Sequence, residues 1–405
     1  MKLSLCMIVK DEEQALPACL DSVKDVVDEI VVLDTGSSDR TMAIAQEYGA
    51  TVAQFPWGND FAAARNQALK YVTGDWVLVL DADEQLTEEA GPHIRTAMAD
   101  DSLLVVSLIR QEIGAVQSPY SLTSRLFRRH EAIRFDRPYH ALIDDSVIAL
   151  LKAEPQWNFA TLQVVALIHS GYEVKAIAQK NKQARAQAAM EAYIADHPDD
   201  PYVCNKLGAL YVNSGKTKEG MALLKRGLKD INIEPPLAYE LHYHLGNAYA
   251  RKRNMDKAVI HYQGAIAQNI FPILKLGALI NFGALLHEAG EYEMAQRPLS
   301  AAIEIDPTCM LAYYNLGLVF KALGHYQNAI AAYEKAIELQ PDYAQAYQNL
   351  GVVWFKCGNV DEALNYFGKA IAILEQTNLL EADQLRRQLK DMGFEAPQFK
   401  VQLEV

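Results

Sequence analysis

The second half of the chain repeats a short pattern, and this repeat limits its fold more than any other feature of the sequence. A leucine or phenylalanine precedes glycine five times, and successive glycines lie 38, 37, 34 and 34 residues apart. These glycines are Gly208, Gly246, Gly283, Gly317 and Gly351. Alanine follows the last four at twelve and again at nineteen residues. Small residues at fixed spacing let paired helices cross closely, so we expect an all-α array.

This pattern resembles the tetratricopeptide repeat, whose period is about 34 residues. The resemblance covers residues 201–376, or about five repeats, and implies two-helix units stacked into a solenoid. We expect residues 377–405 to form a capping helix and tail, because the last repeat would otherwise expose its apolar face. Residues 173–200 are predicted to be a helical linker that ends at His197-Pro198.

Residues 1–172 follow a different pattern, in which short apolar segments alternate with helix-prone ones. The apolar segments 3–9, 28–34 and 75–81 are rich in β-branched residues and are flanked by polar ones. Such segments are typical of buried strands in a largely parallel sheet. With helices expected at residues 40–48 and 60–71, the sequence predicts an α/β domain.

Acidic residues stand where two of these strands end. Asp34 ends the second strand before a Gly-Ser turn, and Asp81-Ala82-Asp83 ends the third. Alternate side chains of a strand point the same way, so Asp81 and Asp83 could converge on one spot at the ligand-binding edge of the sheet. Two carboxylates suit Mg²⁺ or Mn²⁺ shared with a diphosphate. The alternative is an acidic strand-to-helix turn in which Glu84 provides a helix-start charge.

Several blocks in this half resemble family-2 glycosyltransferases of the GT-A fold, a Rossmann-like fold for nucleotide-diphospho-sugar transferases. The blocks are residues 6–13, 32–41, 60–66, 75–84, 125–128 and 168–172. The resemblance implies an inverting, metal-dependent transfer of a hexose or N-acetylhexosamine from a UDP-sugar. Bacterial enzymes of this kind with a helical-repeat tail include peptide S- and O-glycosyltransferases. A nucleotide sugar is therefore the expected donor and a peptide or protein the expected acceptor.

The resemblance assigns donor-side roles to particular residues. Val9, Lys10 and Glu12 would line the base pocket, although an acidic residue at Glu12 also suits a helix N-terminus. Asp34 would contribute to uridine recognition while Asp39 or a serine caps the next helix.

The resemblance also assigns the diphosphate end of the donor. Arg65 would bind a phosphate or a uracil carbonyl, the alternative being an ion pair with Asp60. Asp83 would be the main metal ligand, with Asp81 near the ribose or the metal. His169 would complete the metal's coordination or be a hydrogen-bonded histidine at the domain junction.

The acceptor side is less clear from the sequence. Inverting transfer needs a base that removes the acceptor's proton. His140 matches a His-Glu pair that the family often has, but Ala141 replaces the glutamate. Further candidates for the base are Asp136, Asp144 and Asp145, any one of which could instead belong to a surface acidic turn. Arg125, Arg128 and Arg129 form a basic run that faces either the diphosphate or solvent.

Charge and cysteine content limit the partners. The chain has 38 Lys and Arg against 51 Asp and Glu, a net charge of −13 that argues against nucleic-acid binding. Its five cysteines lack metal-binding spacing, and no segment is long enough for a membrane span, so we expect a cytoplasmic protein. The repeats would recruit the acceptor or form a homodimer. Two alternatives are an enzyme that acts on an envelope glycan and a repeat scaffold with an inactive glycosyltransferase-like head.

Overall fold

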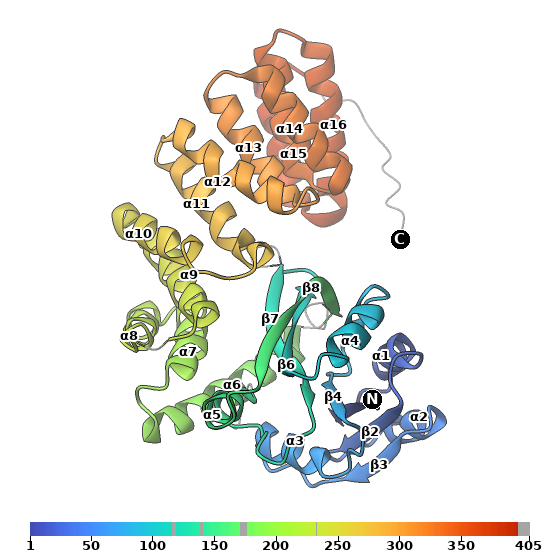
Figure 1. Cartoon of the computed structure of the whole chain (residues 1–405). Coiled ribbons are helices and arrows are strands. Elements are labelled where there is room, and N and C mark those ends of the chain that lie inside the picture. Colours follow the sequence, from blue (N-terminus) through green and yellow to red (C-terminus); the bar gives the residue numbers. More distant parts are fainter. Residues whose placement is uncertain (116–118, 138–140, 171–175, 232, 396–405) are drawn as a thin grey trace. The chain divides into compact units, whose positions relative to one another are not determined.

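The computed structural model describes residues 1–115, 119–137, 141–170, 176–231 and 233–395 (Figure 1). The chain divides into two compact units, Met1–Leu237 and Ala238–Val405. The first unit holds the α/β half together with the helices α6 (Ala176–Asp196), α7 (Pro201–Asn213) and α8 (Thr217–Gly227). The start of the repeats therefore belongs to the same compact unit as the α/β half. The domain boundary predicted after residue 172 marks a change in the sequence pattern, and it stays a prediction.

An eight-stranded sheet in the order β3-β2-β1-β4-β7-β6-β8-β5 forms the centre of the first unit. Its strands are β1 (Leu3–Val9), β2 (Glu29–Asp34), β3 (Thr51–Gln54), β4 (Trp76–Val79), β5 (Glu84–Leu86), β6 (Leu103–Glu112), β7 (Tyr120–Arg128) and β8 (Asn158–His169). The first four are parallel, while β7 pairs antiparallel with both β4 and β6, and β5 pairs antiparallel with β8. The sheet is thus mixed, and the predicted parallel order holds for its first half.

Helices cover both faces of this sheet. Leu3, Leu5 and Met7 of β1 face the side covered by α1 (Leu16–Val23), α2 (Thr41–Glu47) and α4 (Ala90–Met98). Cys6, between them, faces the side covered by α3 (Phe61–Leu69) and α5 (Asp144–Ala153). Both faces of β1 are buried because its residues are apolar at nearly every position, as expected for a central parallel strand.

The parallel register brings three strand ends to one edge of the sheet. Val9 at the end of β1 lies beside Asp34 at the end of β2, and Cys6 of β1 lies beside Val79 at the end of β4. Ligands of open α/β sheets bind outside the carboxyl ends of such strands. The residues that follow β1, β2 and β4 therefore form the edge where a site is expected.

The repeats are helical throughout their described residues. They continue from α8 through α9 (Pro235–Arg251), α10 (Met255–Ile266), the short 3₁₀ helix η1 (Pro272–Lys275), α11 (Leu276–Glu288), α12 (Tyr292–Ile305), α13 (Met310–Ala322), α14 (Tyr326–Leu339), α15 (Ala344–Lys356), α16 (Val360–Thr377) and α17 (Leu379–Asp391). At Gly317 a Cβ atom would lie 2.5 Å from the Tyr333 ring, so glycine is what lets α13 and α14 cross this closely. The predicted fold class, an α/β domain followed by tetratricopeptide repeats, is confirmed.

Candidate active site

Asp34 anchors the turn after β2 with one of its two carboxylate oxygens. Its side chain is fully buried, and its Oδ1 accepts hydrogen bonds from the backbone N–H groups of Gly36 (2.9 Å) and Ser37 (3.0 Å). Within the described residues its Oδ2 has no hydrogen-bond partner. A buried carboxylate oxygen without a partner is costly unless a ligand donates to it.

The turns after β1 and β2 are joined by side-chain hydrogen bonds. Asp11 adopts a left-handed backbone (φ 54°), and its Oδ1 accepts from the backbone N–H of Ser38 at 2.7 Å. Ser37 and Ser38 thus hold the β1 turn rather than capping α2, and Asp39 Oδ1 accepts from the Thr41 N–H instead. Val9, Lys10, Glu12 and Asp34 accordingly come to one edge, although their role in base binding remains a prediction.

Asp81 is held between two arginines. Its Oδ1 accepts from Arg65 of α3 at 2.6 Å, and its Oδ2 accepts from Arg125 of β7 at 3.0 Å. Burial raises the pKa of Asp81, but the charges of Arg125 and Arg65 outweigh it and hold this pKa well below its usual range. The alternative ion pair between Arg65 and Asp60 is replaced, because Asp60 caps α3 by accepting from the Ala63 N–H.

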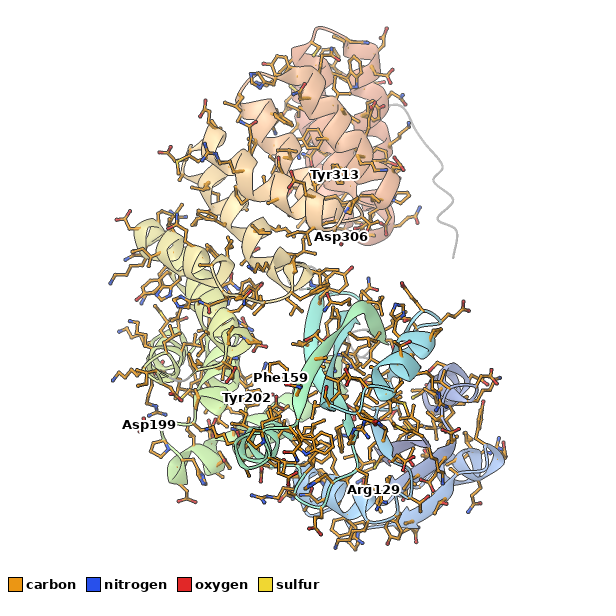
Figure 2. The ribbon with its side chains drawn as sticks, in the orientation of Figure 1. Arg129, Phe159, Asp199, Tyr202, Asp306 and Tyr313 are labelled. Carbon is orange, nitrogen blue, oxygen red and sulfur yellow. The ribbon has the colours of Figure 1, made fainter. Side chains whose placement is uncertain are left out.

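The two other arginines of the predicted basic run have structural contacts. Arg128 lies over the rings of Trp76 and Trp157, and Arg129, labelled in Figure 2, donates to the carbonyl of Gly74. Among the described residues, Arg125 is therefore the one arginine of this run that binds carboxylates of the candidate site.

Glu84 contacts several residues of this site. Its position in the sequence indicated only a charge at the start of a helix. It is fully buried in β5, and its Oε1 accepts from Arg110 of β6 at 2.6 Å. Its Oε2 accepts from the backbone N–H of Asp81 at 2.9 Å and lies 3.6 Å from Arg125. Glu84 therefore fixes the turn that carries Asp81, Ala82 and Asp83.

Asp83 faces a histidine from the far half of the sheet. Its Oδ2 lies 3.3 Å from His169 Nε2 at the end of β8, because β5 and β8 pair antiparallel with Glu84 opposite His169. The other ring nitrogen of His169 contacts Glu112 at 2.6 Å. Burial lowers the pKa of His169, but its hydrogen bonds to the carboxylates of Asp83 and Glu112 outweigh this effect and raise the pKa to about 9.

Asp81 and Asp83 have different partners, which bears on where a divalent cation would fit. A carboxylate oxygen of Asp83 and a ring nitrogen of His169 face each other, and Glu112 contacts the other ring nitrogen, as carboxylates do behind the histidines of many metal sites. Both Asp81 oxygens are bonded to arginines. Within the described residues no group of three or more metal-binding side chains occurs, so this pair would need donor oxygens and water to complete the coordination.

The acceptor-side candidates differ in their surroundings. Asp144, the first residue of α5, is largely buried; its Oδ1 accepts from Ser124 at 3.1 Å, and its Oδ2 has no partner among the described residues. Burial raises its pKa. Asp145 is half exposed and forms an ion pair with Arg137 at 2.8 Å, whereas His140 lies outside the described residues.

Comparisons with known proteins identify the family of each part of the chain. The model of the family described as Glycosyl transferase family 2 matches residues 4–158, and tetratricopeptide-repeat models match segments between residues 205 and 378. A TPR repeat-containing protein of Synechococcus elongatus is 45% identical over 305 residues, covering 74% of this chain and 76% of that protein. The chain belongs to the family-2 glycosyltransferases that carry tetratricopeptide repeats.

Other relatives of this glycosyltransferase match shorter parts of the chain. An uncharacterized glycosyltransferase of Rickettsia felis is 27% identical over 188 residues, covering 44% of this chain and 66% of that protein. The SPbeta prophage-derived glycosyltransferase SunS of Bacillus subtilis is 26% identical over 228 residues, covering 55% of this chain and 52% of that protein. The predicted enzyme class is confirmed, and a glycosyltransferase of this family takes its sugar from a nucleotide-sugar donor. Within the described residues no helix has the length and apolar character needed to span a bilayer.

Proposed function

We propose that this glycosyltransferase moves a hexose or N-acetylhexosamine from a UDP-sugar to a peptide or protein acceptor, with inversion and with Mg²⁺ or Mn²⁺. The proposal rests on two groups of polar side chains that lie at one edge of the sheet. Asp34 presents a buried, unpartnered oxygen, and Arg65 and Arg125 converge on Asp81. The first suits a ribose hydroxyl or uracil N–H, and the second suits a diphosphate.

The two arginines are the groups that bind the leaving diphosphate. The Nη1 atoms of Arg65 and Arg125 are both buried without a hydrogen-bond partner among the described residues, and Arg125 Nη1 lies 3.6 Å from Glu84 Oε2. A guanidinium donates in a fixed fork geometry, so the remaining N–H groups can bind phosphate oxygens while Asp81 orients the other side. In this proposal Asp81 positions both arginines for the charge that develops on the diphosphate as its bond to the sugar breaks.

Asp83 and His169 are the residues that would hold the divalent cation. The bound cation would neutralise part of the charge on the departing diphosphate. This part of the proposal is supported by the facing Asp83 oxygen and His169 nitrogen, and by Glu112 behind the histidine ring.

Asp144 is the base that the surroundings favour. Its raised pKa and unpartnered Oδ2 suit proton removal, while the carboxylate of Asp145 is neutralised by Arg137. Asp144 would accept the acceptor's proton as the acceptor atom bonds to the anomeric carbon and the carbon–oxygen bond to the diphosphate breaks. His140 remains a candidate base.

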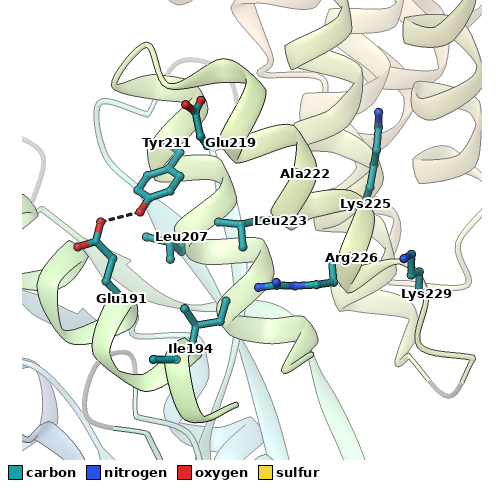
Figure 3. A pocket seen from close by; sticks show the side chains of 11 residues that line it. Glu191, Ile194, Leu207, Tyr211, Glu219, Ala222, Leu223, Lys225, Arg226 and Lys229 are labelled. Atoms are coloured by element: carbon teal, nitrogen blue, oxygen red, sulfur yellow. Dashed lines mark hydrogen bonds between the residues drawn. The ribbon is translucent and has the colours of Figure 1, made fainter. Parts of the chain in front are cut away.

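A groove of about 860 Å³ between α6, α7 and α8 supports a peptide acceptor. Its floor includes the apolar side chains of Ile194, Leu207 and Leu223. Figure 3 shows Glu191 and Glu219 on one side of it, with Glu191 accepting a hydrogen bond from Tyr211, and Lys225, Arg226 and Lys229 on the other. A peptide with an apolar centre and opposite charges at its two ends would match these surfaces.

A cytoplasmic location is also part of the proposal, and the five unpaired thiols support it.

Isothermal titration and a hydrolysis assay test this proposal. We expect UDP to bind the full chain in Mn²⁺ and much more weakly in EDTA, and Asp83→Ala to lose this dependence on metal. We also expect slow release of UDP from UDP-glucose or UDP-N-acetylglucosamine without any acceptor. Binding to Asp83→Ala that keeps its full metal dependence would remove the metal assignment. An active chain that prefers another nucleotide would remove the UDP assignment, and no turnover of any nucleotide sugar would refute the donor-side proposal.

A further inference from the structure

A buried arginine joins the acceptor side of the site to the first repeat helix. The side chain of Arg137 is 7% exposed, and its guanidinium lies 5.2 Å from the centre of the Tyr202 ring of α7. Its Nε and Nη2 donate to Asp200 Oδ2 at 3.1 and 2.9 Å, and its Nη1 lies 2.8 Å from Asp145 Oδ2. One side chain therefore contacts the starts of both α5 and α7.

Each of these contacts lies at the first turn of a helix. Asp200 is the N-cap of α7, where its Oδ1 accepts from the Val203 N–H at 2.8 Å while its Oδ2 binds Arg137. Asp145 is the second residue of α5, next to Asp144. Arg137 thus links the cap of one helix to the first turn of the other, and all of these residues belong to the first compact unit.

The backbone of Arg137 indicates that these contacts outweigh a local cost. Its φ of 74° lies in the left-handed region, which is uncommon for residues with a Cβ. Residues kept in this region cluster at functional sites. In this conformation the side chain contacts Asp145, Asp200 and Tyr202.

Charges around Asp144 come from a small set of groups. Ser124 of β7 donates to its Oδ1, Asp145 adds a neighbouring negative charge, and Arg137 supplies the positive charge that opposes it. Burial raises the pKa of Asp144 and Asp145 adds to this, whereas the hydrogen bond from Ser124 and the charge of Arg137 lower it. Removing the Arg137 charge would therefore raise the pKa of Asp144 further.

We infer that Arg137 is a positioning residue for the transfer reaction, which holds the start of α5 against the first repeat helix and sets the charge around Asp144. The inference rests on the proposed function, because it takes Asp144 as the base. It also makes the start of the repeats, through Asp200 and through Tyr202, which is labelled in Figure 2, part of the structure that supports catalysis.

The test compares three variants of the full chain in acceptor-free hydrolysis of UDP-glucose or UDP-N-acetylglucosamine with Mn²⁺. Arg137→Gln removes the charge, Arg137→Lys keeps it without the fork geometry, and Arg134→Gln is the matched control. Arg134 comes from the same segment, but its side chain is 68% exposed and lies 3.4 Å from Asp136 in an ion pair at the surface.

We expect Arg137→Gln to lower kcat by about 10- to 100-fold with little change in donor KM, because the base is displaced while the donor site is intact. Its rate should reach half-maximum at a higher pH than the wild-type rate. Arg137→Lys should lower kcat but reach its half-maximal rate at the same pH as wild type. Arg134→Gln should have the wild-type kcat and pH profile. Hydrogen exchange of residues 144–153 should be faster in both Arg137 variants.

The outcomes separate this inference from the proposed function. An active wild-type chain in which Arg137→Gln keeps the kcat and pH profile of Arg134→Gln overturns the inference alone. If Arg137→Gln does not fold, Arg137→Lys decides the matter, and a wild-type kcat in that variant overturns the inference. A wild-type chain that hydrolyses no nucleotide sugar refutes the proposed function and this inference with it.

Discussion

Replacing Glu84 with glutamine tests how the candidate site is held together. Both oxygens of this buried carboxylate accept hydrogen bonds, Oε1 from Arg110 and Oε2 from the backbone N–H of Asp81. A glutamine amide has one acceptor oxygen, so its NH₂ group must face one of these two donors. Rotation of the glutamine amide cannot give both donors an acceptor, because Arg110 and the Asp81 N–H face different oxygens of the original carboxylate.

The size of the effect follows from these contacts. Glu84→Gln loses about 2 kcal/mol for one charge-assisted hydrogen bond and about 2 kcal/mol for a buried donor left without a partner. The resulting loss of about 4 kcal/mol lies within the range of about 3–5 kcal/mol for a broken buried ion pair. In a unit of this size we expect the melting temperature of the first unit to fall by about 10 °C.

Urea denaturation followed by tryptophan fluorescence is a suitable assay for Glu84→Gln. Three of the four tryptophans, Trp57, Trp76 and Trp157, lie in the first unit. The midpoint should fall while the slope stays the same, because the surface exposed on unfolding is unchanged. Glu88→Gln is the control, since Glu88 is exposed in the same segment and should change stability by less than about 0.5 kcal/mol. A loss below about 1 kcal/mol in Glu84→Gln would refute the reasoning.

Three further predictions concern other parts of the chain. Asp144→Asn should lower kcat for UDP-sugar hydrolysis by about 100- to 10,000-fold with little change in donor KM, and the wild-type rate should fall with decreasing pH through the raised pKa of Asp144; an unchanged kcat would exclude it as the base. Burial raises the pKa of Glu29, but hydrogen bonds from Ser4, Thr73 and Lys2 outweigh this effect and lower the pKa to about 2. The ionised Glu29 therefore stabilises the folded state by up to about 3 kcal/mol above pH 4.5, and this stabilisation is lost as the pH falls towards 2. The difference in urea stability between wild type and Glu29→Gln should therefore shrink from pH 6 to pH 3, and a constant difference would contradict it. Gly317→Ala should destabilise the second unit by about 1–3 kcal/mol in calorimetry because its Cβ would meet the buried Tyr333 ring at 2.5 Å, whereas Gly351→Ala, at 3.0 Å from Phe367, should cost less.

The fold could be predicted where the signal is local. The repeats show themselves because the same small residues recur at each helix crossing, and Gly317 against Tyr333 is one such crossing. The first strands are recognisable because β1 and β4 are apolar on both faces. The second half of the sheet was not predicted, because β7 follows β6 along the chain but pairs between β4 and β6 in space.

The candidate site was predicted in its residues more than in its contacts. Asp34 and Asp83 stand at strand ends that the pattern of the sequence identifies. The partner of Arg65 did not follow from spacing, because Asp81 lies sixteen residues away and comes close only through the order of the strands. Glu84 resembles a helix-start acid in sequence, and its role depends on Arg110, which β6 brings to it. Such contacts depend on the order of the strands, which the sequence pattern alone does not specify.

The division of the chain after Leu237 has a consequence for how such enzymes can diversify. Helices α7 and α8 share a compact unit with the catalytic half, and Arg137 binds the first of them. Repeats beyond this point contact mainly their neighbours, so duplication or deletion of a later repeat would leave the contact between Arg137 and the first repeat intact. The first repeat is therefore constrained by its contacts with the α/β half, whereas a change in the later repeats would leave those contacts intact.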